Sequence, residues 1–465
     1  MNETLKQYLA PWASLRLTVS LLGMATFLVF AGTVAQIDKG IWTVVDEYFR
    51  CLFAWVEFQV FLPRSWNVPG GVWFPGGWLI GGLVFINLLS AHLIRFRVQA
   101  RGARFYAGLA VIAVGVVQTY LVIAGVFNQD IAATESAAFW RVLLRLAKGG
   151  GAAGVLMAGC VLLFRKRAGI VLLHSGIVML LIAEFVTGTT AVEGRMRINA
   201  GESVNFIEHV RTVELVFIDR SDPDTDHVTV IPMRVLRRGG VIRDNRLPVD
   251  VEVVRYMKNS RVLDAGRTGP AVANPATAGA GLRAVAVEEP EASGTDPEQK
   301  LDIPAVYVTL SHKDTGAPLG TYLATPWLKG TALDPQVTAV DGKAHDLSLR
   351  FARTYKPYRI ELLEFQHDKY VGTETPRNFS SLVRLVDETR GVDRTVKIWM
   401  NNPLRYAGET FYQSSFEPGK NLTILQVVRN HGWMIPYLSC MFVAIGMAAH
   451  MGSKLTDFLR RRSRS

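Results

Sequence analysis

The sequence contains few cysteines and none of the short motifs that mark common catalytic sites. Its 465 residues include three cysteines, Cys51, Cys160 and Cys440, and no C-x-x-C pair. The chain therefore does not resemble a thiol–disulfide carrier, whose reactive thiols come in such pairs. G-x-S-x-G, H-E-x-x-H and phosphate-binding glycine loops are also absent, so no catalytic arrangement is recognisable in the sequence.

The net charge of +11 would suit nucleic-acid binding, but its distribution argues against that function. Many of the basic residues stand in short clusters beside apolar runs, as membrane topology requires. We therefore expect a membrane lipid environment and no nucleic-acid partner. The clusters are Arg95, Arg97, Arg101 and Arg104; Arg165, Lys166 and Arg167; and Lys454, Arg460, Arg461, Arg462 and Arg464.

Six apolar runs are candidates for transmembrane helices, each of which needs roughly 20 mostly apolar residues. The first is too long for the apolar core of a cleaved signal peptide, so we interpret it as a retained span. The runs predict an N-terminal membrane domain of five spans over residues 1–189 and a final span with a basic tail over 431–465. They cover residues 15–36, 77–94, 107–127, 150–164, 168–186 and 433–451.

One topology accounts for every basic cluster. With six spans, all the clusters and both termini fall on one side, which is then the cytoplasm. Residues 37–76, 128–149 and 187–432 are expected to lie outside. The segment 37–76 contains amphipathic and tryptophan-rich stretches, so we interpret it as a helix lying in the membrane interface.

Residues 190–430 are expected to form a large extracytoplasmic domain that is mostly β, with a sandwich or barrel-like fold. Short runs there alternate apolar and polar residues, which is the period of a strand. Residues 259–302 are rich in Gly, Ala, Pro and acidic residues, and we expect a long loop or disordered insert there. The expected strands are 213–218, 228–236, 249–257, 305–311, 347–352, 358–365, 381–386, 395–400 and 422–428.

Three histidines, His92, His174 and His450, lie within the expected spans. An ionisable group there costs about 2–3 kcal/mol unless it is partnered, so each is a candidate functional residue. All three lie within about 4–10 Å of the cytoplasmic charge clusters along their helices. Such a layer suits haem, whose iron imidazole ligates within an apolar pocket. The alternative is a side chain that reaches the interface, which we favour for His450 and weigh equally for the other two.

Several segments resemble the ResB (CcsB) family of system II cytochrome c biogenesis proteins. The most specific is NNPLRYAGETFYQSSF at 401–416, just before the last span. Weaker similarities occur in LRLTVSLL of the first span, in HSGIVMLLIAEFVTG at 174–188 and in the segment 355–387. The order of early spans, large exported domain and final span is also that of the family. Typical members have four spans, so the pair within 107–164 is additional.

The resemblance implies a subunit in a bacterial inner (cytoplasmic) membrane that handles haem together with a CcsA/ResC-type partner. The pair would carry haem across the membrane and present it to apocytochrome c, forming a haem-attachment (cytochrome c synthetase) complex. The tryptophan-rich WWD segment of such partners is absent here, so this chain would be one half of the complex and carry no catalytic residue itself. The resemblance implies His92 as a haem iron ligand, with the second ligand from the partner or from His174.

Two other functions remain open from the sequence. The chain could be a membrane-anchored binding or structural module that recruits a partner through its β domain. It could also be a b-type haem protein that transfers electrons, although that function needs histidine pairs at both membrane depths. Only the inner layer is populated, apart from His431 at the outer edge of the last span, so we rank electron transfer last.

Overall fold

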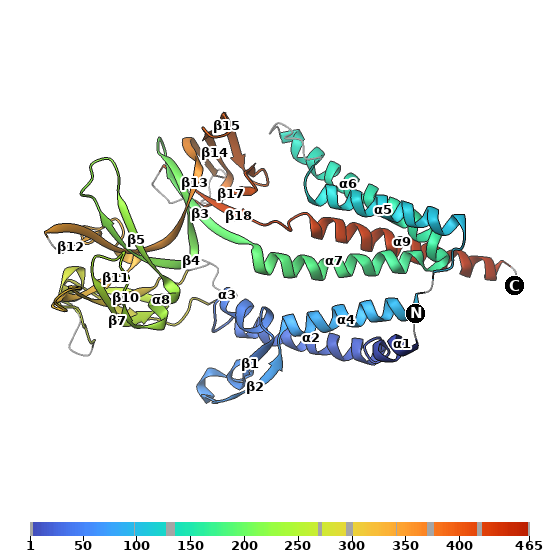
Figure 1. The fold of residues 1–465 in the computed structure, drawn as a ribbon, viewed down its shortest axis with the longest axis horizontal. Helices are drawn as coiled ribbons and strands as arrows, with labels where there is room; N and C mark the ends of the chain where they lie inside the picture. Colours follow the sequence, from blue (N-terminus) through green and yellow to red (C-terminus); the bar gives the residue numbers. More distant parts are fainter. Residues whose placement is uncertain are drawn as a thin grey trace.

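The computed structural model describes residues 3–96, 98–126, 135–267, 272–293, 301–340, 342–369, 376–415 and 421–463. Long helices run side by side at one end of the molecule, and the strand-rich part lies at the other end (Figure 1). Both termini lie at the far end of the helices from the strands (Figure 1). The expected combination of apolar helices and a large, mostly β domain is therefore confirmed.

The helices match most of the expected apolar runs. Among the described residues five segments are long and apolar enough to cross a membrane, and one of these, Val142–Thr190, has 49 residues and contains most of α6 together with α7. The expected count of six spans is therefore not confirmed. The helices are α1 Glu3–Leu9, α2 Leu15–Ala35, α3 Ile41–Val44, α4 Gly77–Arg95, α5 Ala103–Ile123, α6 Glu135–Phe164, α7 Ala168–Thr190, α8 Met233–Arg238 and α9 Ile435–Arg462.

Two helices are longer than the sequence indicates. Helix α6 begins at Glu135, although the expected span began at residue 150 and 128–149 was expected to lie outside the membrane. Helix α9 continues to Arg462, beyond the expected end at residue 451. In both cases charged residues lower the local hydropathy without interrupting the backbone hydrogen bonds, so an apolar window ends before the helix does.

The prediction of an interfacial helix within residues 37–76 is wrong. Apart from the short α3, a π-helical turn at Val45–Phe49 and two 3-10 turns at Phe58–Phe61 and Arg64–Trp66, the segment forms a hairpin of β1 Phe53–Glu57 and β2 Gly71–Pro75. Ala54 and Val56 of β1 are buried while Phe53 and Trp55 are exposed. This alternation over five residues has the period of a strand, but it is short and rich in aromatic residues, so it can also be taken for an amphipathic helix.

The long helices form two groups. Helices α2 and α4 pack together, and α5, α6, α7 and α9 form the second group (Figure 1). Within the first group Asn87 of α4 binds the turn before α2: its amide nitrogen donates to the carbonyl oxygens of Trp12, at 2.6 Å, and Ser14, at 3.1 Å. Thr18 of α2 donates to the amide oxygen of Asn87 at 2.7 Å. A buried asparagine thus has its polar atoms satisfied between apolar helices.

Helices α7 and α9 approach so closely that their backbones touch. A Cβ added to Gly169 would lie 2.6 Å from the carbonyl oxygen of Gly446. One added to Gly446 would lie 2.6 Å from the nitrogen of Leu173, and one added to Gly176 would lie 2.7 Å from the carbonyl oxygen of Ser439. Small residues allow this approach, which brings dispersion contacts between helices where no hydrophobic effect drives association.

The β domain, residues 192–429, contains two larger sheets and a hairpin. The long sheet has the order β15-β14-β13-β4-β3-β18-β17-β16, with β12 on β13 and β5 on β4. A four-stranded sheet has the order β11-β10-β7-β6, and β8 pairs with β9. The strands are β3 Val192–Asn199, β4 Ser203–Asp219, β5 His227–Pro232, β6 Gly240–Ile242, β7 Asp250–Met257, β8 Ser260–Asp264, β9 Ala284–Glu288, β10 Ala305–Ser311, β11 Pro318–Ala324, β12 Gln336–Val340, β13 Lys343–Lys369, β14 Pro376–Asp387, β15 Val392–Trp399, β16 Leu404–Tyr406, β17 Glu409–Ser415 and β18 Leu422–Arg429.

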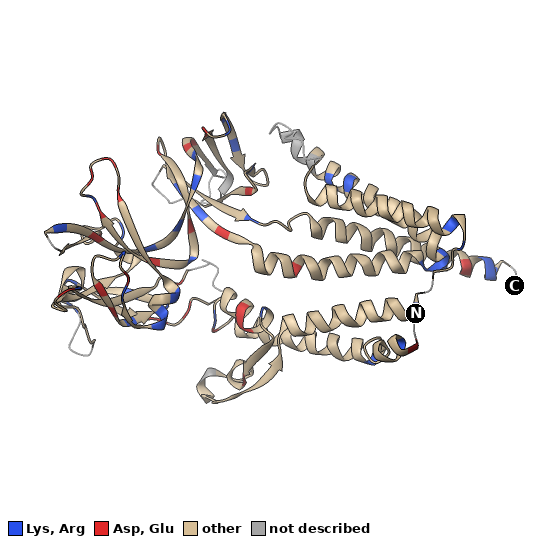
Figure 2. Cartoon of the chain, in the orientation of Figure 1, with Lys and Arg blue, Asp and Glu red and all other residues tan. Residues whose placement is uncertain are grey.

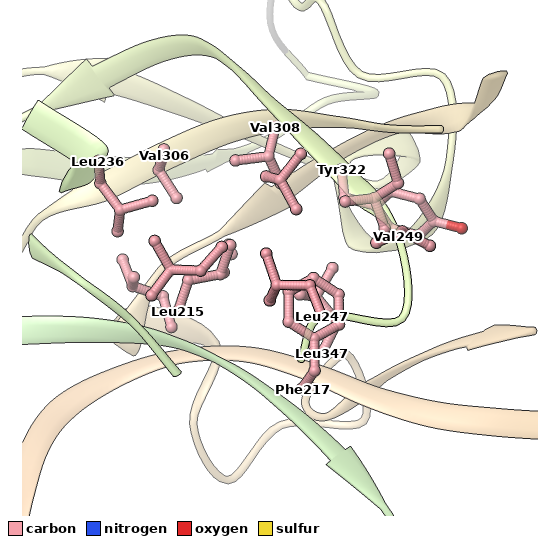
Figure 3. Close-up of a cluster of buried hydrophobic side chains, with 14 of the residues drawn as sticks. Leu215, Phe217, Leu236, Leu247, Val249, Val306, Val308, Tyr322 and Leu347 are labelled. Atoms are coloured by element: carbon pink, nitrogen blue, oxygen red, sulfur yellow. The ribbon is translucent and has the colours of Figure 1, made fainter. Parts of the chain in front are cut away.

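Strands β4 and β13 are long enough to join two lobes. Their paired ends around Phe217 and Leu347 pack against the four-stranded sheet and form the distal lobe, a two-layer sandwich (Figure 3). Figure 3 shows Leu215, Phe217 and Leu347 facing Val306 and Val308 across this core. The other ends of β4 and β13 join β3 and β14–β18 in the proximal lobe, nearer the helices, whose core includes Met196, Ile360 and Phe411.

Two sequence predictions within this domain are wrong. The strand expected at 228–236 stops at Pro232, and α8 follows, burying Leu236 in the distal core. The segment 259–302, expected to be a long loop or disordered, contains the hairpin β8–β9 in its described residues. Ala284 and Ala286 of this hairpin pack against Met257 and Tyr307. Alanine is a poor strand former, so packing rather than local propensity forms β9.

Two helices of the second group continue directly into the β domain. Helix α7 ends at Thr190 and β3 begins at Val192, while β18 ends at Arg429 and α9 begins at Ile435. Strands β3 and β18 pair antiparallel from Val192↔Arg429 to Asn199↔Leu422. The pair α7–α9 is thus extended by a hydrogen-bonded pair of strands, which ties the helices to the proximal lobe.

Lysine and arginine gather at the end of the helices that carries both termini, while most of the helix surface is uncharged (Figure 2). The apolar helices make this chain a membrane protein. Within them an acidic side chain, Glu184 of α7, forms an ion pair with Arg50, with an N–O distance of 3.6 Å.

We predict that Gly176→Val destabilises the helix bundle by about 1–3 kcal/mol, because the new methyl groups overlap the backbone of α9. Gly154→Val in α6 is the matched control, since a Cβ at Gly154 meets nothing within 4 Å. Thermal unfolding of the purified full chain in detergent measures the effect. Equal unfolding midpoints for the two variants would contradict the close packing of α7 and α9.

Candidate functional site

Two of the three span histidines meet between the two groups of helices. His92 projects from α4 and His174 from α7, and the Nδ1 atom of His174 lies 3.1 Å from the Nε2 atom of His92. The ring centroids are 4.8 Å apart, and the ring planes are nearly perpendicular, at 89°. The two imidazoles therefore form a hydrogen bond that crosses the space between α4 and α7.

Three contacts hold the ring of His92. Its Nδ1 atom lies 2.8 Å from the carbonyl oxygen of Leu88, one helical turn earlier. Its ring stacks on Phe96 with a centroid distance of 4.5 Å and an angle of 8° between the planes. The third contact is the hydrogen bond with His174. Because both ring nitrogens and one ring face are engaged, His92 is well oriented before any ligand binds.

Basic side chains lie beyond the imidazoles at the seam between α4 and α7, which is the line along which the two groups of helices meet. The guanidinium of Arg167 lies 6.0 Å from the ring centroid of Phe96 and donates to the carbonyl oxygen of Arg95 at 2.9 Å. Arg95 in turn donates to the carbonyl oxygen of Ala13 at 2.8 Å. The histidine pair thus lies next to the basic end of the helices.

A cavity of about 480 Å³ adjoins the histidine pair. Its volume is within the range of about 300–1,000 Å³ that is usual for small-molecule and cofactor sites. Five helices line it, including α5 and α6, which are the additional pair expected within 107–164. The lining residues are Leu89 and His92 of α4; Ile112, Val116 and Thr119 of α5; Leu156, Cys160 and Phe164 of α6; Val171, Leu172, His174, Ser175, Val178 and Met179 of α7; and Phe442 of α9.

The polar groups that line this cavity differ in how readily they could bind a ligand. The hydroxyl groups of Thr119 and Ser175 donate to the carbonyl oxygens of Gly115 and Val171 within their own helices. The Cys160 thiol is buried, and an apolar environment disfavours the thiolate that ligates metals. The imidazoles of His92 and His174 are therefore the groups best suited to hold a ligand, in a setting whose other walls are apolar.

The third span histidine does not join this pair. His450 lies in α9, where its backbone packs against Gly169 of α7, and it is not among the cavity lining residues. Its buried Nδ1 atom has no hydrogen-bond partner among the described residues. Outside the pair, the described ranges contain no group of three or more His, Cys, Asp and Glu side chains that could hold a metal ion.

The sequence identified both histidines but neither the rest of the cavity nor the role of Phe96. The cavity walls are ordinary apolar residues whose positions depend on how five helices pack. Small residues at Gly108, Gly115 and Gly159 mark the close contact of α5 with α6. Phe96 stands four residues after His92, which places it over the same helix face, and this spacing is a signal that sequence analysis could have used.

A buried charged cluster organises the segment before the last helix. Glu409 of β17 is 5% exposed, and it accepts hydrogen bonds from Lys356, at 2.6 Å, and from the hydroxyl of Tyr358. Burial, followed by the hydrogen bond to Glu409, raises the pKa of Tyr358 well above its ordinary value, so the phenol stays protonated and donates. The cluster joins β13 to β17 at the core of the proximal lobe.

The family match concerns this same part of the chain. Residues 334–434, from β12 to the beginning of α9, match the ResB-like family. Protein NrfI of Wolinella succinogenes is 32% identical over 91 residues, which make up 20% of this chain and 10% of that protein. The chain thus covers only about a tenth of the length of this relative. The similarity expected from the segments 355–387 and 401–416 is confirmed.

We predict that Lys356→Met destabilises the β domain by about 3–5 kcal/mol, because it leaves the Glu409 carboxylate buried without its cation. Lys343→Met is the matched control on the same strand, since Lys343 is 62% exposed and lies 3.9 Å from Asp219; its loss costs no more than about 1 kcal/mol. Urea unfolding of the full chain in detergent, followed by circular dichroism, compares them. A similar loss in both variants would refute the structural role of the buried pair.

Proposed function

We propose that this chain, whose residues 334–434 match the ResB-like family, is a membrane subunit of cytochrome c biogenesis. In this proposal the chain works with a CcsA/ResC-type membrane partner. Together they carry haem from the cytoplasmic side and present it to apocytochrome c for covalent attachment. The relative and the family match cover part of the chain, and the chemistry of the residues in the helices supports the haem-handling part of the proposal.

The observation that carries the proposal is the pair His92–His174 beside an apolar cavity among membrane helices. Haem suits this site for two reasons. Its iron takes imidazole ligands, and its flat macrocycle requires apolar walls, which α5, α6 and α7 supply. Histidines among apolar helices cost free energy, so their presence favours a function over a purely structural role.

The residues of this chain would bind and orient the haem rather than perform chemistry on it. An imidazole of the pair supplies a ligand, and the apolar residues of α5 and α6 exclude water from the cavity. Haem supplies the iron and the vinyl groups that react with the cysteine thiols of apocytochrome c. Reduction of those thiols falls to another protein, since this chain has no C-x-x-C pair.

A cytoplasmic entry fits the position of the pair. Arg95 and Arg167 lie beside it, and basic residues favour the cytoplasmic side of a membrane. In this topology both termini are cytoplasmic and the β domain is extracytoplasmic. The continuity of α7 with β3 and of α9 with β18 would then link the haem site mechanically to the domain that meets apocytochrome c.

The proposed function predicts a haem absorption spectrum for the purified protein, alone or with its partner, and loss of cytochrome c maturation in a deletion strain. A double variant His92→Ala/His174→Ala should remove the spectrum, because both imidazoles of the site are lost. His450→Ala is the control outside the cavity and should retain it. Normal cytochrome c maturation in the deletion strain would exclude the biogenesis role, and an unchanged spectrum in the double variant would exclude this haem site.

The topology predicts opposite labelling of two exposed positions. In a variant without the three native cysteines, Asp224→Cys in the β domain should react with a membrane-impermeant maleimide in intact cells. Ser463→Cys in the tail should react only after the cells are opened, since it lies on the cytoplasmic side. Labelling of Ser463→Cys but not Asp224→Cys in intact cells would show that the topology is the reverse of the one proposed. The β domain would then lie on the cytoplasmic side, and the proposed transfer of haem to an extracytoplasmic domain would be excluded.

A further inference from the structure

A second hollow on the surface of α5 is separate from the cavity beside the histidine pair. It has a volume of about 570 Å³ and lies where α5 meets α6, and we call it the outer groove. Ile112, Val116 and Thr119 line the histidine cavity, whereas the groove is lined by residues of α5 on another face of the helix. Its lining includes Ala113, Val114, Val117, Gln118 and Val122 of α5 and Lys148 of α6.

The outer groove is apolar along most of its length. Ala113 and Val122 are its outermost residues on α5 and lie nine positions apart, which corresponds to about 13 Å along the helix axis. One leaflet of a bilayer contributes about 15 Å of hydrocarbon. Val114 and Val117 are 61% and 56% exposed, so this wall faces the surroundings of the bundle. The groove therefore has the length and the surface of a site for one acyl chain.

Basic side chains lie at the end of the outer groove that is nearer to the β domain. A Cβ added to Gly151 of α6 would lie 3.5 Å from Nε2 of Gln118, and Lys148 is one helical turn closer to the β domain than Gly151. Arg145 precedes Lys148 by three residues, so the two project from the same side of α6. The guanidinium of Arg145 lies 5.2 Å from the ring centroid of Trp433. Because tryptophan favours the level of the lipid headgroups, the two charges lie near that level.

The charge around this end of the groove is basic. Apart from Glu135, which lies about 15 Å from Arg145 along the helix, α5 and α6 contain no acidic residue. Figure 2 shows lysine and arginine on α6 towards the β domain. Arg145 and Lys148 each make an interaction within the chain, but a guanidinium has five donors and an ammonium three. Both can therefore also donate to the oxygens of an anion, in charge-assisted hydrogen bonds.

We propose that the outer groove binds one phospholipid with a net negative headgroup, from the leaflet nearer to the β domain. Its phosphate oxygens accept hydrogen bonds from Arg145 and Lys148, and one acyl chain lies along α5 beside Val114 and Val117. A headgroup with its own ammonium would bring a further cation next to two basic side chains, so the charge selects the anionic lipid. The site is separate from the histidine pair, and the inference goes beyond the proposed function and does not depend on it.

Native mass spectrometry of the full chain in detergent tests the role of the charges, with phosphatidylglycerol as the anionic probe and phosphatidylcholine as the zwitterionic one. The unchanged protein should retain one phosphatidylglycerol more tightly than phosphatidylcholine. Arg145→Gln and Lys148→Gln should each weaken that binding roughly fivefold, as expected for the loss of one basic side chain near a membrane surface. Lys166→Gln is the control, because Lys166 is 80% exposed at the opposite end of the helices, and it should leave the affinity unchanged.

A second pair of variants tests the role of the groove without changing any charge. Ala113→Phe places a ring in the apolar part of the groove and should weaken the binding of phosphatidylglycerol. Ala110→Phe is the matched control on the same helix, since Ala110 is also exposed but is not among the lining residues. Thermal unfolding of both variants verifies that they fold.

Three results would overturn the proposal. Equal affinity for the two lipids, or unchanged affinity for phosphatidylglycerol in both charge variants, would exclude recognition of the headgroup. An equal rise in the unfolding midpoint with inorganic phosphate and with phosphatidylglycerol would show an anion site without an acyl chain. A benzophenone amino acid in place of Val117 should cross-link to lipid in cell membranes, and a cross-link to a protein of fixed mass would identify a partner helix in the groove instead.

Discussion

The backbone contact between α7 and α9 is the constraint on which the other features depend. Gly169, Gly176 and Gly446 bring the two helices together, and no larger side chain fits between them. These helices are far apart in the chain, yet each continues into one of two paired strands, β3 and β18. The close contact therefore orients the proximal lobe and, at the same time, positions the face of α7 that carries His174.

A second constraint is the seam between α4 and α7, where the two groups of helices meet. It has polar contacts at both ends and an imidazole pair near its basic end. Arg50 and Glu184 form an ion pair at the β-domain end, close to the ring contact of Trp78 with Phe185. Because these contacts are few, the seam is held by specific bonds rather than by extensive packing.

Helices α5 and α6 have a physical role in this arrangement. They supply one wall of the cavity, through residues such as Val116 and Leu156, and α6 packs on α7 and α9 while α5 packs on α6. A bundle without them would expose this side of the histidine pair to lipid or to a neighbouring protein. In this chain α5 and α6 themselves form this wall and keep water away from the imidazoles.

The sequence predicted those features that depend on composition and period. Hydropathy located the long helices and the histidines within them, and alternation located about half of the strands that the structure describes in the β domain. Prediction from the sequence failed where the local pattern and the tertiary environment differ. Charged residues lowered the hydropathy at the start of α6 and at the end of α9, so both helices were predicted too short. The five alternating residues of β1 were too few to distinguish a strand from a helix. The alanines of β9, which are poor strand formers, left that strand unpredicted. Each error concerns residues whose structure is stabilised by contacts distant in sequence.

The amino-acid sequence by itself determined that this chain is a membrane protein with a large β domain, because apolar length and residue period are local properties. It also determined that imidazoles lie within apolar helices. Only the tertiary structure decided that His92 and His174 meet while His450 does not, that Phe96 and Leu88 hold one ring, and that five helices line the cavity. The direction of a hydrogen bond depends on which atoms face each other, and that is a property of packing between segments far apart in the chain.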